Sequence, residues 1–111
     1  MTNPSNRKGD RAELEAAKLL TDLLGYEVRR ALGAGRADDV GDLYGIPNTV
    51  IQVKAYRDVT RAVADGLADS ERNQANAQAL FGAAMIRRPG GRWFFALTPD
   101  QFATLWREAN L

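Results

Sequence analysis

The stretch that organises this chain is DDVGDLYGIPNTVIQVK, residues 38–54. Two short, largely apolar runs flank a Gly-Ile-Pro-Asn turn, which predicts two β-strands with Asp42 on the first and Gln52 and Lys54 on the second. Because side chains alternate between the two faces of a strand, Gln52 and Lys54 should project on one side and their apolar neighbours on the other. The three polar side chains are therefore expected to meet at one edge of a small sheet.

A carboxylate, an amide and an ammonium group at one sheet edge form a chemically specific set. Carboxylate and carbonyl oxygens hold hard divalent cations, and a fixed positive charge beside them can act on a scissile phosphate or on the attacking water. The pattern is typical of metal-dependent phosphodiester hydrolysis. A plainer interpretation stays open, in which Asp42 flanks a turn while Gln52 and Lys54 form the solvent face of an amphipathic strand.

The composition narrows the class of protein and the chemistry open to it. With 111 residues, 45% of them hydrophobic and 26% charged, the chain suits one folded domain. It has no cysteine and no histidine, which excludes disulfides and sites built on thiolate or imidazole. No apolar run reaches the ~18 residues of a membrane span, and the N-terminus lacks the apolar stretch of a signal peptide. We therefore expect a cytoplasmic protein with no membrane partner.

Positive charge is carried mostly by arginine, although the formal net charge is only +1. Arginine suits phosphate because its planar guanidinium donates two parallel hydrogen bonds. Each arginine taken alone is equally well explained as part of a solvated surface. Only their convergence on one face would favour a nucleic-acid partner.

The N-terminal part predicts a flexible tail over residues 1–8, followed by a single domain over residues 9–111. A helical pattern runs from about Gly9 to Leu24 and ends at Gly25, a residue favoured just after a helix. Glu13 stands at the N-terminal end of the apolar stripe of this helix, so its carboxylate should point toward the body of the protein. The alternative is an ordinary acid in the first turn, favoured by the helix dipole.

The remaining elements are predicted from periodicity and turn signals. A first strand is expected over Tyr26–Leu32, before the glycine-rich loop that carries Arg36. After Tyr56, one short helix should end near Gly66, and Ser70 could cap a second that runs to about Phe81. A hairpin over residues 83–97 turns at Pro89-Gly90-Gly91, and Thr98-Pro99-Asp100-Gln101 is a strong helix start. The order α-β-β-β-α-β-β-α predicts an α/β fold with a mixed sheet flanked by helices.

Several of these residues together resemble a known family of nucleases. Asp42, followed after nine intervening residues by Gln52-Val53-Lys54, resembles the PD-(D/E)xK signature. The segment from Lys8-Gly9 to Glu13 is similar to the first-helix motif of archaeal-type Holliday junction resolvases, including phage and bacterial relatives. The resemblance extends from about Lys8 to Tyr56 and implies a restriction-endonuclease-like fold.

The resemblance also implies roles for individual residues. Asp42 would ligate Mg²⁺ or Mn²⁺, helped by Glu13, by the side-chain carbonyl of Gln52 and by the backbone carbonyl of Val53. Lys54 would orient or help to deprotonate the attacking water and stabilise charge in the transition state. The implied catalytic set is therefore Glu13, Asp42, Gln52 and Lys54.

Two positions depart from the family pattern. Gly41 stands where the family has proline, at a position that only shapes the turn. Gln52 replaces an acidic ligand, so the site loses one negative charge unless Glu13 or Asp39 supplies it. On this interpretation Gln52→Glu should tighten metal binding. Without compensation, the fold would bind DNA and leave it uncut.

The function implied is a structure-selective endonuclease that resolves four-way DNA junctions as a homodimer, because symmetric nicks need two active sites. Its dimer surface is expected on the helices of residues 59–81 and on the Trp93 hairpin. The open alternatives are another nuclease of the same fold acting on flaps, mismatches or restriction-like sites, a non-catalytic DNA-binding protein, and a protein-interaction module. The residues expected to bind DNA phosphates are Lys8, Arg29, Arg30, Arg36 and Arg57.

Overall fold

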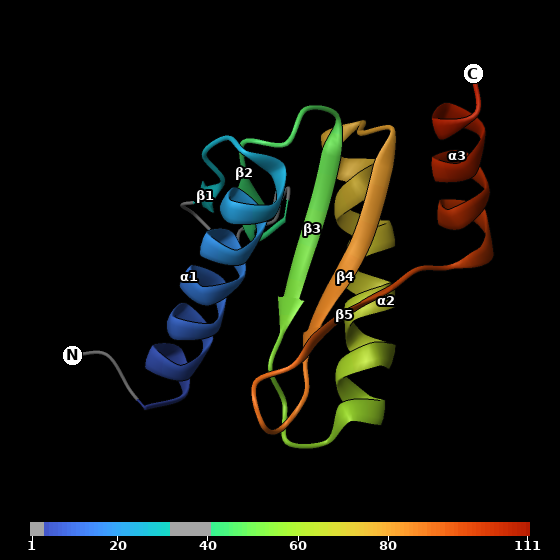
Figure 1. The fold of residues 1–111 in the computed structure, drawn as a ribbon. Helices are drawn as coiled ribbons and strands as arrows, with labels where there is room; N and C mark the ends of the chain where they lie inside the picture. The colour runs from blue at the N-terminus through green and yellow to red at the C-terminus, as the bar shows by residue number, and fades with distance from the viewer. Residues whose placement is uncertain (1–3, 32–40) are drawn as a thin grey trace.

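The computed structural model describes the backbone of residues 4–31 and 41–111, with side chains from residue 9 onward within these ranges. In this part of the chain, three helices and five strands follow the order expected from the sequence. Figure 1 shows their arrangement. The elements are α1 (Pro4–Leu24), β1 (Arg29–Arg30), β2 (Leu43–Tyr44), β3 (Thr49–Lys54), α2 (Val59–Ala77), β4 (Phe81–Arg87), β5 (Trp93–Ala96) and α3 (Pro99–Ala109).

The strands form two sheets, whereas the sequence predicted one mixed sheet. β3 pairs in parallel with β4, and β4 pairs antiparallel with β5, so the larger sheet is mixed. β1 and β2 form a separate antiparallel ladder. The Asp42 N–H, which donates to the Ile51 carbonyl oxygen (2.9 Å), joins this ladder to β3. Asp42 itself lies one residue before β2, not on it.

The first strand is shorter than the predicted Tyr26–Leu32, and Thr21 of α1 explains part of the difference. The Thr21 hydroxyl accepts a hydrogen bond from the Val28 N–H (2.8 Å), and the nearest acceptor for its own proton is the Ala17 carbonyl oxygen (2.8 Å), with the Val28 carbonyl oxygen farther away at 3.2 Å. The Val28 N–H is thus bonded to the helix side chain instead of to a strand. β1 therefore begins only at Arg29.

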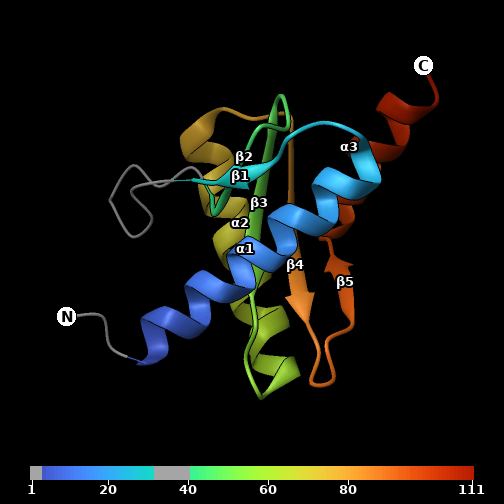
Figure 2. The same cartoon turned by 60° about the vertical axis from the view of Figure 1, so that its left-hand side comes forward.

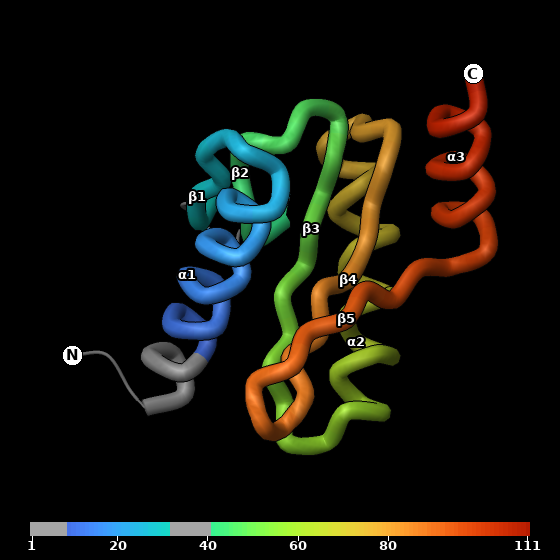
Figure 3. Tube along the Cα trace, viewed as in Figure 1, coloured from blue at the N-terminus to red at the C-terminus, as the bar shows by residue number. Residues whose placement is uncertain are grey.

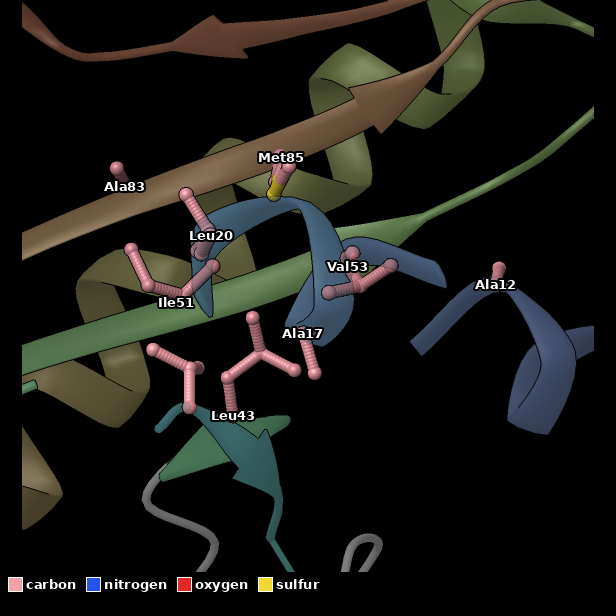
Figure 4. Packing of buried hydrophobic residues seen from close by; sticks show 10 residues of the cluster. Ala12, Ala17, Leu20, Leu43, Ile51, Val53, Ala83 and Met85 are labelled. Carbon is pink, nitrogen blue, oxygen red and sulfur yellow. The ribbon is translucent and has the colours of Figure 1, made fainter. Parts of the chain in front are cut away.

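α1 and α2 cover opposite faces of the larger sheet, which gives three layers (Figure 1; Figure 2, where α1 crosses in front of β3 and β4). Both β3 and β4 are buried along almost their whole length, as expected for parallel strands covered on both faces. On the α1 face, small and branched side chains pack together (Figure 4). This core contains Ala12, Ala16, Ala17, Leu20, Val28, Leu43, Ile51, Val53, Ala83 and Met85.

α2 is one continuous helix, so the prediction of two shorter helices separated near Gly66 is wrong. Gly66 lies in the middle of the helix and against the sheet. A Cβ atom there would lie 2.8 Å from the Ala84 Cβ and 3.2 Å from the Ile86 Cδ1. The glycine therefore serves close packing of α2 on β4, and the hydrogen-bonded helix continues through it.

α1 begins at Pro4, so the N-terminal segment expected to be a tail is helical from that residue onward. Proline is favoured in the first turn of a helix because its φ is already helical and its missing N–H would have no partner there. The expected end at Gly25 is confirmed. Gly25 has φ +81°, and its N–H donates to the Thr21 carbonyl oxygen (2.9 Å).

The C-terminal predictions are confirmed. β4 and β5 form the expected hairpin. Thr98 caps α3 in a capping box with Gln101, and Pro99 follows the cap. α3 stands at the side of the molecule away from α1 (Figure 3). Within the described ranges, no helix is long and apolar enough to cross a membrane.

Candidate functional site

A cavity of about 380 Å³ lies where the N-terminal half of α1, the residue before β2 and the C-terminal end of β3 meet. It is lined by two carboxylates, Glu13 and Asp42, and by Lys54. The remaining lining residues are small, apolar or aromatic: Gly9, Ala12, Val53, Ala55 and Tyr56. The structure therefore brings together four of the residues singled out in the sequence: Glu13, Asp42, Val53 and Lys54. They come from three segments far apart along the chain.

Asp42 is held in place by the backbone of β3. Its Oδ2 accepts a hydrogen bond from the Val53 N–H (2.8 Å), and the residue is only 8% exposed. The preceding Gly41 has φ +107°, and a Cβ there would lie 2.9 Å from the Val50 Cγ1. Proline cannot adopt this φ. Glycine, and not the proline of the nuclease pattern that the sequence resembles, is thus what this local backbone requires.

Glu13 faces the cavity from the third turn of α1, because that helix begins at Pro4. The alternative interpretation of Glu13 as a first-turn acid is therefore wrong. Its side chain is 13% exposed and accepts a hydrogen bond from Arg30 Nε (3.3 Å). Burial, followed by the negative charge of Asp42, raises the pKa of Glu13, while the Arg30 guanidinium opposes the rise. A further positive charge at the cavity would relieve the repulsion between the two carboxylates.

Lys54 extends from the end of β3 to the same cavity and to α2. Its Nζ lies 2.7 Å from Asp69 Oδ2, and its side chain is 15% exposed. Burial by itself lowers the pKa of Lys54, but the contact with Asp69 and the electrostatic effects of Tyr56 and Asp42 outweigh it, so the pKa is raised. Lys54 is therefore a cation at neutral pH, which suits orientation and charge stabilisation and disfavours a role as a base.

Gln52 does not reach this cavity, contrary to the expectation that it would stand beside Asp42. It is 3% exposed, and its Oε1 accepts a hydrogen bond from Asn73 Nδ2 on α2 (2.8 Å). Ile51 and Val53 face α1, while Gln52 faces α2 from the middle of β3. Lys54 shares that face but, as the last residue of the strand, also reaches the cavity. In this geometry the amide is a contact between sheet and helix, and it is not available as a metal ligand.

The arginines converge only in part. Arg30 reaches the cavity rim, where its Nη2 lies 2.8 Å from Asp10 Oδ1 and its Nε contacts Glu13. Arg29 is exposed and stacks over the Tyr44 ring, 5.5 Å from its centroid. Arg57 is exposed near the end of β3. Of the other residues expected at the site, Arg36 and Asp39 lie outside the described ranges, as does the side chain of Lys8.

Two carboxylates are a small donor set for a cation. Among the residues that the structure describes, no group of three or more Asp or Glu could hold a metal. Mg²⁺ is nevertheless commonly bound by one or two carboxylates, with water and substrate phosphate completing its shell. Glu13 and Asp42, which line one cavity, fit that kind of site in number and chemistry, and a cation there would offset the negative charge of Asp42 that raises the pKa of Glu13.

Two polar residues in the surroundings of the site were not anticipated from the sequence. Asp69 and Asn73 both lie on α2 and contact the Lys54 and Gln52 side chains. An uninterrupted helix would have placed them one turn apart on the same face as Gly66. The prediction of two helices divided near Gly66 gave no such shared face for Asp69 and Asn73.

The chain was also compared with known proteins. No family model, no curated protein and no solved structure matches it.

Proposed function

We propose that the protein is a metal-dependent nuclease with a restriction-endonuclease-like fold that hydrolyses phosphodiester bonds in branched DNA, with four-way junctions as the preferred substrate. One observation carries the proposal. A single cavity gathers Glu13, Asp42 and a protonated Lys54, which come from three different segments of the chain. Two carboxylates beside an ammonium are the groups that metal-assisted phosphodiester hydrolysis needs.

Each residue has a distinct part in the proposed reaction. Glu13 and Asp42 would hold Mg²⁺ or Mn²⁺, which supplies Lewis-acid stabilisation of phosphate charge when bound. Asp42 is kept in orientation by the Val53 N–H. The Lys54 ammonium stabilises negative charge that develops on the phosphate oxygens. Arg30, at the rim, is placed to meet a neighbouring phosphate of the backbone.

Cutting a four-way junction symmetrically requires two active sites, so the proposal includes a homodimer. The expected surface over residues 59–81 and the Trp93 hairpin is only partly apolar: no large exposed hydrophobic side chain lies on the described α2, while Leu80 and Phe95 are exposed nearby. Exposed large apolar side chains are denser on α3, at Phe102, Leu105 and Trp106. We therefore place the proposed contact between two copies on α3 and the adjacent β5.

A second candidate function is a DNA-binding protein of the same fold that does not cut. It is favoured by the withdrawal of Gln52 from the cavity, which removes an oxygen ligand, and by the ion pair of Arg30 with Glu13, which offsets part of the negative charge available to a cation. The two functions differ in their dependence on metal. Binding without cutting should be indifferent to Mg²⁺ and to the charge of Asp42.

The deciding experiment compares cleavage of a synthetic four-way junction with cleavage of a linear duplex of matched sequence, in Mg²⁺, Mn²⁺ or EDTA. Asp42→Asn is the test variant, because its amide oxygen can still accept the Val53 N–H while the charge is lost. Asp65→Asn is the control, since Asp65 pairs only at 3.8 Å with Arg61 on the outer part of α2. We expect paired nicks in the junction alone, abolished by EDTA and by Asp42→Asn and retained in the control.

Other outcomes distinguish the remaining functions. Cutting of flaps or linear DNA with the same dependence on metal and Asp42 would keep the nuclease and reject the junction preference. Tight junction binding without nicks in either metal would establish the non-catalytic function. Absence of DNA binding at physiological salt would contradict both and favour a protein-interaction module.

A further inference from the structure

Asp69 of α2 contacts Lys54, a residue that lines the cavity. Its Oδ2 lies 2.7 Å from Lys54 Nζ, and its Oδ1 lies 2.7 Å from Arg72 Nη2. Each carboxylate oxygen therefore has its own cation, which fixes the orientation of the group. Of the two cations, Lys54 is the buried one, with 15% of its side chain exposed against 63% for Arg72.

The close approach of α2 to the sheet is what allows this contact. Gly66 lies three residues before Asp69 on the same helix, and a Cβ at Gly66 would lie 2.8 Å from the Ala84 Cβ and 3.4 Å from the Lys54 Cγ. Residues three apart on a helix are neighbours on one face. The stem of Lys54 therefore runs along the glycine, and its ammonium ends at the carboxylate one turn later.

A lysine needs such a partner more than most residues do. Its ammonium sits on a flexible four-carbon stem, so holding it in one place costs conformational entropy. The other groups that act on the Lys54 charge are Tyr56, with its ring centroid 5.9 Å from Nζ, and the cavity carboxylate Asp42. Asp69 is the carboxylate in direct contact with Nζ, and it approaches from the α2 side.

We propose that Asp69 is a positioning residue that holds the Lys54 ammonium at the edge of the cavity, so that phosphodiester cleavage depends on Asp69 through Lys54. The inference rests on the proposed nuclease function. Asp69 does not line the cavity and is assigned no contact with substrate or metal. Its loss should therefore slow the chemical step and leave DNA affinity in place.

The first test measures single-turnover cleavage and junction affinity for Asp69→Asn, Asp69→Glu and the matched control Asp65→Asn. A misplaced catalytic group costs up to about a hundredfold in rate, so Asp69→Asn should lower the cleavage rate by roughly tenfold to a hundredfold with an unchanged Kd for the junction. Asp69→Glu should recover part of the rate, because it restores a carboxylate. Asp65→Asn should match the wild type.

The second test is a double-mutant cycle with Lys54→Met, which keeps the length of the stem and removes the charge. If Asp69 acts through Lys54, then Asp69→Asn should change the residual rate little in the Lys54→Met background. The same cycle is measured on the free energy of unfolding in urea, without DNA or metal. That second readout reports the ion pair as a structural contact, independently of any nuclease activity.

Three results would overturn the inference. Equal rate losses from Asp69→Asn with and without Lys54 would show that Asp69 does not act through it. A loss confined to the junction Kd would make Asp69 part of the binding surface instead. A wild-type protein that cuts no DNA would reject the proposed function itself. Coupling of the two residues in the unfolding cycle would then identify the pair as purely structural.

Discussion

The side chain of Gln52 lies buried between β3 and α2. The alternation along β3 was predicted, and it places Gln52 and Lys54 on one face as expected. That face is covered by α2, where the Gln52 amide oxygen bonds to Asn73 Nδ2. Asn73 is itself 1% exposed, and its Oδ1 has no hydrogen-bond partner among the described residues. The two amides thus form a buried polar contact between sheet and helix.

This geometry reverses the effect expected of Gln52→Glu. A carboxylate at a position 3% exposed is poorly solvated, and Lys54 on the same face is already paired with Asp69, so the variant should lose about 1–3 kcal/mol of unfolding free energy at pH 7. Burial raises the pKa of the new carboxyl above its unfolded value. The deficit should therefore shrink as the pH falls toward 4 and the group takes up a proton. Urea unfolding at the two pH values measures it.

Metal affinity is the second quantity to measure for Gln52→Glu. Calorimetric titration with Mn²⁺ should give wild-type affinity for Gln52→Glu, because the side chain does not reach Glu13 or Asp42. Tighter binding with unchanged stability would show that residue 52 turns toward the cavity after all. That result would restore the role expected from the sequence.

Glycine has two different uses in the helices, and substitution by alanine separates them. Gly66 packs α2 on β4, where a Cβ would lie 2.8 Å from the Ala84 Cβ. Gly9 lies in α1 with nothing within 4 Å of a Cβ placed there. Overpacking costs about 1–3 kcal/mol, while alanine gains up to about 1 kcal/mol over glycine in a helix.

We therefore expect opposite signs from the two substitutions. Gly66→Ala should destabilise the protein by about 1–2 kcal/mol, and Gly9→Ala should stabilise it by up to about 1 kcal/mol. Thermal and urea unfolding of the two variants provide the measurement. Stabilisation by Gly66→Ala would show that α2 lies farther from the sheet, and would also weaken the argument that Gly66 brings Asp69 to Lys54.

At the scale of the whole molecule, Glu15 links α1 to the β4–β5 hairpin. Its Oε1 accepts hydrogen bonds from Trp93 Nε1 (2.9 Å) and Arg87 Nε (3.2 Å), which lie more than 70 residues later in the chain. These contacts, led by the Trp93 hydrogen bond, lower the pKa of Glu15 below its ordinary value of 4.5. These hydrogen bonds hold α1 against the β4–β5 hairpin.

The stabilisation that Glu15 provides should depend on pH. Because its folded pKa is lowered, the contribution is present above pH 4.5 and is lost as the pH falls through the folded value. The side chain is 44% exposed, so solvent screens the interaction, and Glu15→Gln should cost only about 0.5 kcal/mol at pH 7. The unfolding free energies of the two proteins should converge as the pH falls below the folded pKa of Glu15. A constant difference at every pH would assign the effect to packing.

What could be read from the sequence alone were features set by neighbouring residues. The Thr98 capping box, the Pro89-Gly90-Gly91 hairpin turn, the alternation along β3 and the inward direction of Glu13 all follow from local backbone geometry, which a few consecutive residues determine. The element order follows from these signals in turn. The sequence therefore predicted the helices and strands that form the three layers, and it predicted that Glu13 and Asp42 belong to the candidate site.

Only the tertiary structure decided which surface each element meets. The sequence predicted a helix end near Gly66, whereas in the structure Gly66 packs against β4 within a continuous helix. It also predicted Gln52 as a metal ligand, whereas α2 covers that side chain. The contact of Asp69 with Lys54 depends on both facts. Packing between layers joins residues far apart in the chain, and its distances depend on the volume of every side chain between them. Local patterns carry no record of those distances, so the surroundings of the cavity had to come from the folded molecule.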